Sequence, residues 1–515
     1  MNQRILSDVL IRNAKRTPHK AGLVFQGRTF SFQEINERVN RLTQALRSLE
    51  VRRHSRVAIL ADNCPEYVEA LFATSKLGAI LVPLNTRLHK DELLYVINSS
   101  EPVVVILEID YSNLLESILP QCHSAPNTIV IGGSKEQHSY EGLISRYPAN
   151  ESQEKIDEND LACLAYTGGT TSEPKGSELT HRSMIGSALN AVFGCDIRTK
   201  DIALATTPLF HAAGLWPLLA HFYIGAGAVL LPLKGGFDPD LILTAIEKER
   251  ITFINSVPTI VSRLADQATR KKYDLSSLRW LGYGGSPMPS SILEKSLSIF
   301  GRKLGQVYGL TEICGPATVL LPEDHVLTGT EKQTAKLRSC GKEIHDIEVK
   351  LFDKDDKEVA TGDVGEIVIK SEAVMRGYWK MQEATINTIR SGYFHSGDLA
   401  QKDEDGYIYI VDRLKDMIIS GGENIYPREV EEVLAVHPAV SEVAVIGVPD
   451  EEWGESVKAV IVLQDGKSAT EESIIKFCKE RIASYKKPKS VSFVTELPKN
   501  ARGKILKKEL RKRFV

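Results

Sequence analysis

The sequence lacks the cysteine pattern of a disulfide-stabilised or zinc-binding protein. Its seven cysteines are odd in number and scattered along 515 residues, with no paired metal-ligand spacing. It also lacks a basic-then-apolar leader at the amino terminus, and no apolar run reaches the roughly 18 residues that span a membrane. These absences predict a reducing, cytoplasmic location and no transmembrane segment.

An excess of one charge is absent as well. The 64 basic and 67 acidic residues give a net charge of −3, which offers no general attraction for nucleic acid. The hydrophobic fraction of 42% and the charged fraction of 25% are ordinary for a globular enzyme. Only the stretch from Lys476 onward is uneven, with 14 Lys and Arg against 3 Asp and Glu. That stretch fits either a solvated helix or a face near an anionic ligand.

Strand-like apolar runs alternate with helical patterns along much of the chain. The runs lie at 56–62, 79–83, 103–107, 128–131, 201–207, 226–233, 251–255 and 278–283. This alternation predicts an α/β fold with largely parallel sheets in two similar halves. After Gly341, shorter apolar runs separated by turn residues predict an antiparallel β region.

The length exceeds what one hydrophobic core usually supports, so more than one domain is expected. We predict a large amino-terminal domain over residues 1–411 and a charged hinge at 412–416. A small, mobile α+β domain would then occupy residues 417–515.

A glycine- and hydroxyl-rich segment surrounds one lysine at residues 166–176, Tyr-Thr-Gly-Gly-Thr-Thr-Ser-Glu-Pro-Lys-Gly. Glycines let backbone N–H groups point inward, hydroxyls add donors and Lys175 adds positive charge, which suits the phosphates of a nucleotide. The spacing excludes the common P-loop, because Pro174 precedes the lysine and Gly176 follows it. A polar turn between a strand at 161–166 and a helix from about Thr180 would explain the same composition.

Further short segments carry side chains suited to a nucleotide. Tyr308-Gly-Leu-Thr-Glu312 combines a ring that can stack on a base with a hydroxyl and a carboxylate that can hold a divalent cation. Asp398, in Tyr-Phe-His-Ser-Gly-Asp, can accept hydrogen bonds from both ribose hydroxyls. The remaining segments are 283–287, 412–416, 421–424 and 498–504.

In this order and at these separations, the segments resemble those of the adenylate-forming superfamily. The nearest resemblance is to acyl-CoA synthetases, with 4-coumarate–CoA ligases as near relatives, and it covers almost the whole chain. It departs from the common Thr-Ser-Gly-Thr-Thr-Gly, because this chain has Gly168 and Ser172 where serine and glycine are usual.

The resemblance implies an ATP-dependent acid–CoA ligase with Mg²⁺, in which Lys504 bridges the substrate carboxylate and the α-phosphate. Thr170 and Glu312 would place the metal, and Lys415 would be the hinge residue. Lys504, Glu312, Thr170 and His211 would be catalytic. The residues at ATP or AMP would be Thr167, Gly168, Gly169, Thr170, Thr171, Ser172, Lys175, Gly284, Gly285, Ser286, Tyr308, Gly309, Thr311, Asp398, Arg413 and Lys504.

Two further groups of residues follow from the resemblance. The passage for CoA would be lined by Gly421, Gly422, Glu423 and Trp453. The acyl pocket would be lined by His211, Ala212, Ala213, Leu215, Val257, Pro258, Thr259 and Gly285. These pocket residues are small or apolar, which favours a fatty or aryl acid without a charged tail.

Rival functions are an aryl acid–CoA ligase of the coumarate, ferulate or benzoate type, transfer of the acyl adenylate to a carrier-protein thiol or to an oxygenation reaction, and a non-catalytic binder. The full set of charged residues argues against a pure binder. The expected partners are a carboxylic acid, ATP and CoA, without nucleic acid, and a homodimer is one assembly open to such a chain.

Overall fold

The computed structural model describes residues 4–133, 139–151, 154–167, 174–234, 236–286, 288–420, 423–451, 453–499 and 505–514. Contacts along the chain divide it into two compact units. Of the described residues, unit 1 holds those within 4–167, 174–349 and 369–394, and unit 2 holds those within 350–368 and 395–514. The hinge at 412–416 and the domain boundaries on either side of it stay predictions.

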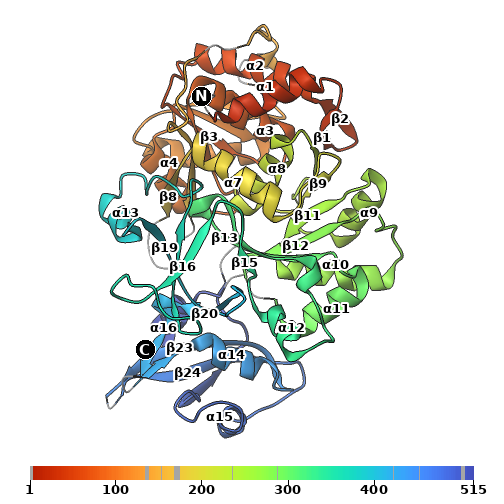
Figure 1. The fold of residues 1–515 in the computed structure, drawn as a ribbon. Coiled ribbons are helices and arrows are strands. Elements are labelled where there is room, and N and C mark those ends of the chain that lie inside the picture. The colour runs from red at the N-terminus through yellow and green to blue at the C-terminus, as the bar shows by residue number, and fades with distance from the viewer. Residues whose placement is uncertain are drawn as a thin grey trace. The chain divides into compact units, whose positions relative to one another are not determined.

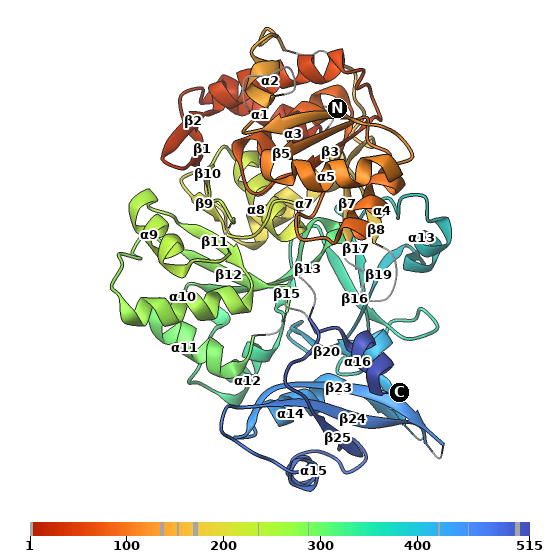
Figure 2. The ribbon, with the colours of Figure 1, turned by 180° about the vertical axis from the view of Figure 1, so that it is seen from behind.

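The first sheet of unit 1 has the strand order β6-β5-β3-β4-β7-β8, with every neighbouring pair parallel except β7 and β8. Most of its strands are buried apolar runs, whereas β8 is largely polar, and helices α4 and α5 lie together over the sheet (Figure 2). The strands are β3 (Arg56–Leu60), β4 (Ile80–Pro83), β5 (Val104–Glu108), β6 (Asn127–Ile131), β7 (Leu161–Thr167) and β8 (Lys175–Thr180). The helices are α3 (Pro65–Leu77), α4 (Lys90–Ser100), α5 (Ser112–Ile118) and α6 (Tyr140–Ile144).

The second sheet has nine strands in the order β15-β14-β13-β12-β11-β9-β10-β1-β2. Strands β1, β10, β9, β11, β12 and β13 are parallel to their neighbours in that series, and antiparallel strands flank them. The strands are β1 (Ala21–Phe25), β2 (Arg28–Ser31), β9 (Ile202–Ala205), β10 (Gly227–Leu230), β11 (Phe253–Ser256), β12 (Trp280–Gly284), β13 (Leu304–Leu310), β14 (Gly315–Leu320) and β15 (Lys342–Glu343).

Helices cover both faces of the second sheet. On one side α9 (Pro239–Glu249), α10 (Pro258–Arg270) and α11 (Ser290–Phe300) pack in one apolar core with β9, β11 and β12 (Figure 1). On the other side α8 (Ala212–Tyr223) packs against α7 (His181–Gly194) and β11. The remaining helices of unit 1 are α1 (Leu6–Arg16), α2 (Phe32–Ser48), α12 (Glu331–Ala335) and α13 (Gln382–Thr388).

The prediction of shorter strands after Gly341 is wrong, because the strands at Tyr393–Lys402, Val440–Asp450 and Gly454–Leu463 have 10, 11 and 10 residues and are the longest described. The antiparallel pairing expected there is confirmed where Tyr393–Lys402 pairs with its two hydrogen-bonded neighbours Ile389–Arg390 and Ile408–Arg413. One sheet has the order β16-β17-β19-β18, with β20 beside β19, and these strands are β16 (Glu348–Phe352), β17 (Gly365–Lys370), β18 (Ile389–Arg390), β19 (Tyr393–Lys402) and β20 (Ile408–Arg413). The last sheet has the order β22-β21-β24-β23, with β25 beside β24, and a core shared with the helices. Its elements are β21 (Ile418–Ser420), β22 (Glu423–Ile425), β23 (Val440–Asp450), β24 (Gly454–Leu463), β25 (Ser490–Phe493), α14 (Pro427–Ala435), α15 (Glu471–Lys479) and α16 (Lys507–Phe514). The predicted α/β fold class is confirmed.

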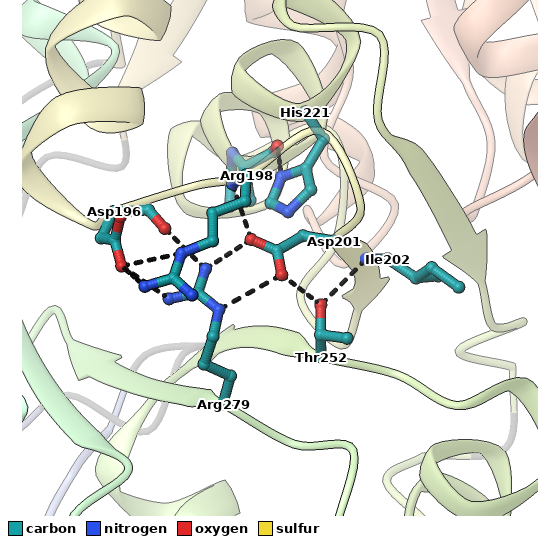
Figure 3. Close-up of polar contacts among 8 residues, drawn as sticks. Asp196, Arg198, Asp201, Ile202, His221, Thr252 and Arg279 are labelled. Carbon is teal, nitrogen blue, oxygen red and sulfur yellow. Dashed lines mark hydrogen bonds and ion pairs between the residues drawn. The ribbon is translucent and has the colours of Figure 1, made fainter.

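A buried ionic cluster joins three strands of the second sheet at their amino ends (Figure 3). Asp201, just before β9, accepts hydrogen bonds from the Thr252 hydroxyl at 2.8 Å, the Arg198 amide at 2.7 Å and the Arg279 guanidinium. Thr252 in turn accepts from the Ile202 amide at 2.9 Å. Because Asp201, Thr252 and Arg279 precede β9, β11 and β12, this cluster fixes the strands that carry the candidate site at their opposite ends.

Candidate active site

The predicted phosphate-binding segment connects β7 to β8. These strands pair antiparallel with Thr167 opposite Lys175, and the Thr167 hydroxyl donates to the Lys175 carbonyl at 3.3 Å. Gly176 follows, and a Cβ there would lie 3.0 Å from the Tyr166 ring, so a larger residue would require that ring to shift. Lys175 is half-buried. The predictions for Gly168, Gly169, Thr170, Thr171 and Ser172 lie outside the described residues.

Glu312 lies in a 3₁₀ turn, Thr311–Ile313, that follows β13. Its carboxylate accepts a hydrogen bond from the Tyr378 hydroxyl at 2.9 Å, and its carbonyl accepts from the Met375 amide at 2.7 Å. The ring of the same tyrosine lies 5.0 Å from Lys175 Nζ. Burial, followed by the nearby Glu312 charge, raises the pKa of Tyr378, so its hydroxyl stays a donor at neutral pH.

The ends of β12 and β13 bring two more predicted segments side by side. Gly284 pairs with Val307 in the parallel register, and a Cβ on Gly284 would meet the Val307 carbonyl at 2.3 Å. Gly285 has φ +78°, a conformation that other residues rarely adopt, and Gly285 and Ser286 are exposed. Tyr308 and Gly309 follow Val307 on β13. The predicted segments at 284–286 and 308–309 therefore lie at the carboxyl ends of two neighbouring parallel strands, where α/β proteins bind ligands.

The predicted acyl residues lie at the same edge of the second sheet. His211 is the N-cap residue of α8, and its ring lies 4.5 Å from that of Phe210. Val257, after β11, has a methyl group 3.9 Å from where a Cβ on Gly285 would stand. Ala212 and Ala213 are half-buried, Leu215 and Pro258 are buried, and Thr259 is exposed.

Asn63, which sequence reasoning missed, holds the loop that leads to His211. Its side-chain oxygen accepts from the Leu209 amide at 2.8 Å, and its side-chain nitrogen donates to the Thr207 carbonyl at 3.1 Å. The side chain is 1% exposed. An asparagine after an apolar strand is the one signal that could have marked it, since such residues often bind a neighbouring loop.

The predicted ribose residues lie opposite each other in unit 2. Asp398 on β19 pairs with Arg413 on β20 in the antiparallel register, and the guanidinium lies 2.9 Å from the carboxylate. Asp398 is 4% exposed. Beneath it, Glu366 accepts from the Gly397 amide at 2.9 Å and contacts the His395 ring at 2.8 Å. This arrangement fixes the turn that presents Asp398.

Lys415 lies in a 3₁₀ turn, Leu414–Asp416, directly after β20. Glu423 begins β22 and pairs with Ser420 on β21, so two residues connect these strands. Trp453 is 43% exposed, with Lys489 Nζ 4.9 Å from its ring. Gly421, Gly422 and Lys504 lie outside the described residues, although Lys499 and Ile505 form a bridge on either side of the last segment.

Much of the basic carboxyl-terminal stretch is paired within unit 2. The pairs are Lys486 with Glu429, Lys489 with Asp450, Lys499 with Glu442, Lys507 with Glu431 and Arg511 with Asp416. Local carboxylates therefore offset much of the charge excess that the sequence displays.

Within the described residues no group of three or more acidic, histidine or cysteine side chains could hold a metal by itself. No helix there is long and apolar enough to cross a bilayer. A single carboxylate such as Glu312 fits Mg²⁺ that arrives with a phosphate chain, because magnesium is commonly bound by one or two carboxylates plus phosphates.

The comparisons with known proteins cover nearly the whole chain. Residues 10–379 match the model of the AMP-binding enzyme family, and residues 429–504 match that of the AMP-binding enzyme C-terminal domain. A feruloyl-CoA synthase of an Amycolatopsis species is 38% identical over 98% of both chains. A long-chain fatty acid–CoA ligase of Mycobacterium tuberculosis is 35% identical over 94% of this chain and 93% of its own.

A solved structure gives the same result at the level of the fold. The o-succinylbenzoate–CoA synthetase of Bacillus subtilis, bound to its acyl-adenylate intermediate, superposes with a TM-score of 0.86 at 31% identity over 99% of both chains. The chain belongs to the AMP-binding enzyme family, with the sequence and fold of AMP-forming acid–CoA ligases.

Proposed function

We propose that this ligase activates an aryl carboxylic acid and transfers it to CoA. A carboxylate oxygen of the acid attacks the α-phosphorus of ATP, and the bond to the β-phosphate oxygen breaks, releasing pyrophosphate. The CoA thiol then loses its proton and attacks the acyl carbonyl, and AMP leaves with the electrons of the acyl–oxygen bond. No side chain needs to act as the nucleophile in either step.

The nucleotide would be held by the residues that the family resemblance names. Thr167 and Lys175 of unit 1 would hold the β- and γ-phosphates together with the loop between them, Gly168 to Ser172. Gly284, Gly285, Ser286, Tyr308 and Gly309 would line the adenine site, and Thr311 would reach the α-phosphate. Asp398 and Arg413 of unit 2 would bind the ribose, an assignment supported by their ion pair, which orients the carboxylate.

Mg²⁺ would be held by Glu312 and Thr170 together with phosphate oxygens, and when bound it neutralises charge on the phosphates. Lys504 would supply a second positive charge at the α-phosphate. The carboxylate and the triphosphate repel each other in the first step, because both are negatively charged. Cations placed where charge develops therefore lower the barrier.

The choice of an aryl acid depends on one observation, an aromatic stack at the amino ends of β11 and β12, beyond the acyl residues at the carboxyl ends of these strands. Phe253 on β11 stacks against Trp280 with ring centroids 5.6 Å apart and planes 2° apart, and Trp216 of α8 meets Phe253 edge-on at 6.3 Å. All three are at most 3% exposed. Trp216 lies one helical turn beyond Ala212 and Ala213, so a long alkyl chain lying between α8 and β11 would have to displace these rings.

A panel of acids tests this proposal. With ATP, Mg²⁺ and CoA, we expect kcat/KM for benzoate- and cinnamate-type acids to exceed that for a C16 fatty acid by about tenfold or more. The reason is that an acid too long for the pocket makes strained contacts in the transition state or loses contacts there. AMP release with and without CoA is the measurement. A C16 acid as the best substrate would replace the aryl proposal with the fatty-acid function of the mycobacterial relative.

CoA would enter past Gly421, Gly422, Glu423 and Trp453. Supporting this, Ser420 and Glu423, on either side of these two glycines in the sequence, pair across β21 and β22. A cytoplasmic location, a homodimer and the hinge role of Lys415 stay predictions.

Gly422→Leu is expected to slow thioester formation from supplied acyl-adenylate and CoA by about tenfold or more, while adenylation slows far less, because only the thiol step needs a narrow passage. Ser468→Leu is the control, since Ser468 is an exposed residue of unit 2. Pyrophosphate release and thioester formation are measured separately. Equal rates of thioester formation in Gly422→Leu and the parent protein would contradict the proposal that CoA passes this loop.

A further inference from the structure

Tyr378 lies on a segment that runs along the strand after the phosphate loop. The Glu178 amide donates to the Gly377 carbonyl at 2.9 Å, and the Trp379 amide donates to the Gly176 carbonyl at 2.8 Å. Between these bonds Tyr378 forms an antiparallel bridge with Ser177. Backbone pairing on both sides therefore fixes the position of the tyrosine relative to β8, and so relative to Lys175.

The side chain of Tyr378 then connects two charged groups from distant parts of the sequence. Its hydroxyl donates to Glu312 Oε1 at 2.9 Å, and the face of its ring lies 5.0 Å from Lys175 Nζ. The residue is 9% exposed, so both contacts form with little competition from water. The Met375 amide also binds the Glu312 carbonyl, which fixes the glutamate backbone from the same segment.

We propose that Tyr378 is a positioning residue for the triphosphate and its metal. Its hydroxyl sets the rotation of the Glu312 carboxylate, and its ring restrains the position of the Lys175 ammonium. Both charged groups are thereby oriented toward the phosphates. This role depends on the proposed function of Glu312 and Lys175. It is separate from contact with the nucleotide, since the tyrosine acts through the two charged residues.

The physical reason lies in the geometry that Mg²⁺ demands. Magnesium requires near-octahedral ligands at short distances, so a carboxylate that rotates freely presents its oxygen at the wrong angle for part of the time. A hydrogen bond to one carboxylate oxygen removes that freedom, as outer-shell partners do at other metal sites. A lysine above an aromatic face is likewise restrained by the cation–π attraction.

Tyr378→Phe separates the two contacts, because it removes the hydroxyl and keeps the ring. We expect the Mg²⁺ concentration for half-maximal adenylation to rise about tenfold, as for loss of a hydrogen bond to a charged group, with KM for the acid unchanged. The thermal stabilisation by ATP with Mg²⁺ should shrink, while that by ATP with EDTA stays as in the parent protein. Tyr378→Leu also removes the ring and should weaken both.

Tyr140→Phe is the matched control, since the Tyr140 hydroxyl donates to the Glu69 carboxylate at 2.6 Å and this tyrosine is also buried, at 1% exposed. It removes the same kind of bond within unit 1 and should leave the Mg²⁺ requirement unchanged. A Tyr378→Phe protein with the parent's Mg²⁺ dependence and thermal shift would overturn the positioning role alone. A parent protein that shows no shift with ATP and Mg²⁺ would overturn the proposed function and this role with it.

Discussion

Lys504→Ala is expected to slow formation of the acyl-adenylate from acid and ATP by about 10²–10³-fold, the range measured when one preorganised group is lost from a charged transition state. Two anions meet in this step, and the lysine would neutralise charge between the attacking carboxylate and the α-phosphate. The thiol step starts from an adenylate already formed, so it has no such need. Thioester formation from supplied acyl-adenylate and CoA should therefore stay within a few-fold of the parent rate.

Comparing the two half-reactions makes this test specific, because general damage to the fold would slow both. Lys499→Ala is a suitable control. That lysine lies on the same segment, and its ammonium pairs with Glu442 at 2.6 Å on the surface of unit 2, so its loss should leave both half-reactions intact. Equal loss of both half-reactions in Lys504→Ala would contradict the role of the lysine in adenylation.

The strands that build the site were predictable because they are short, apolar and flanked by turn residues. The run at 103–107 corresponds to β5 at Val104–Glu108, and the run at 278–283 to β12 at Trp280–Gly284. A strand buried on both faces must be apolar throughout, so a short apolar run in the sequence is enough to identify it. The helix expected near Thr180 also begins there, because the threonine side chain caps it.

The contacts that position the site were not predictable in the same way. Asn63 binds a loop more than 140 residues away, and Tyr378 binds Glu312 across 66 residues. A side chain carries no local sign of which distant backbone or carboxylate it will meet, because that depends on the packing of whole sheets. The motifs therefore predicted the charged residues, whereas only the structure supplies the groups that orient them.

The ionic cluster of Figure 3, which stabilises the second sheet, was likewise not predictable from the sequence. In the sequence Asp201 is one acidic residue among many near the surface, yet its side chain is 5% exposed and accepts four hydrogen bonds from Arg198, Thr252 and Arg279. Burial alone raises the pKa of Asp201, but the bonds from Arg279, the Arg198 amide and Thr252 outweigh burial and hold the pKa below its usual value.

Asp201→Ala is expected to lower the free energy of unfolding of unit 1 by about 1–3 kcal/mol, the cost of leaving buried polar groups without a hydrogen-bond partner. The loss leaves the Thr252 hydroxyl beneath β9, β11 and β12 without its acceptor, whereas the Arg279 guanidinium keeps only its contacts with Asp196. The denaturant midpoint read by tryptophan fluorescence measures this, because Trp216 and Trp280 belong to the same sheet and its covering helix. Asp240→Ala is the control, since Asp240 also binds several donors but is largely exposed, and we expect a much smaller change.

The pH dependence of the same variant gives the final test. Because the folded pKa of Asp201 is depressed, its contribution is fully present above the ordinary carboxyl pKa of about 4 and is lost as pH falls through the lower folded value. The difference in stability between the parent protein and Asp201→Ala should therefore be constant from pH 6 to 8 and shrink below about pH 4. A difference that stays constant down to pH 3, or that grows on acidification, would mean that the carboxylate charge is not what joins the three strands.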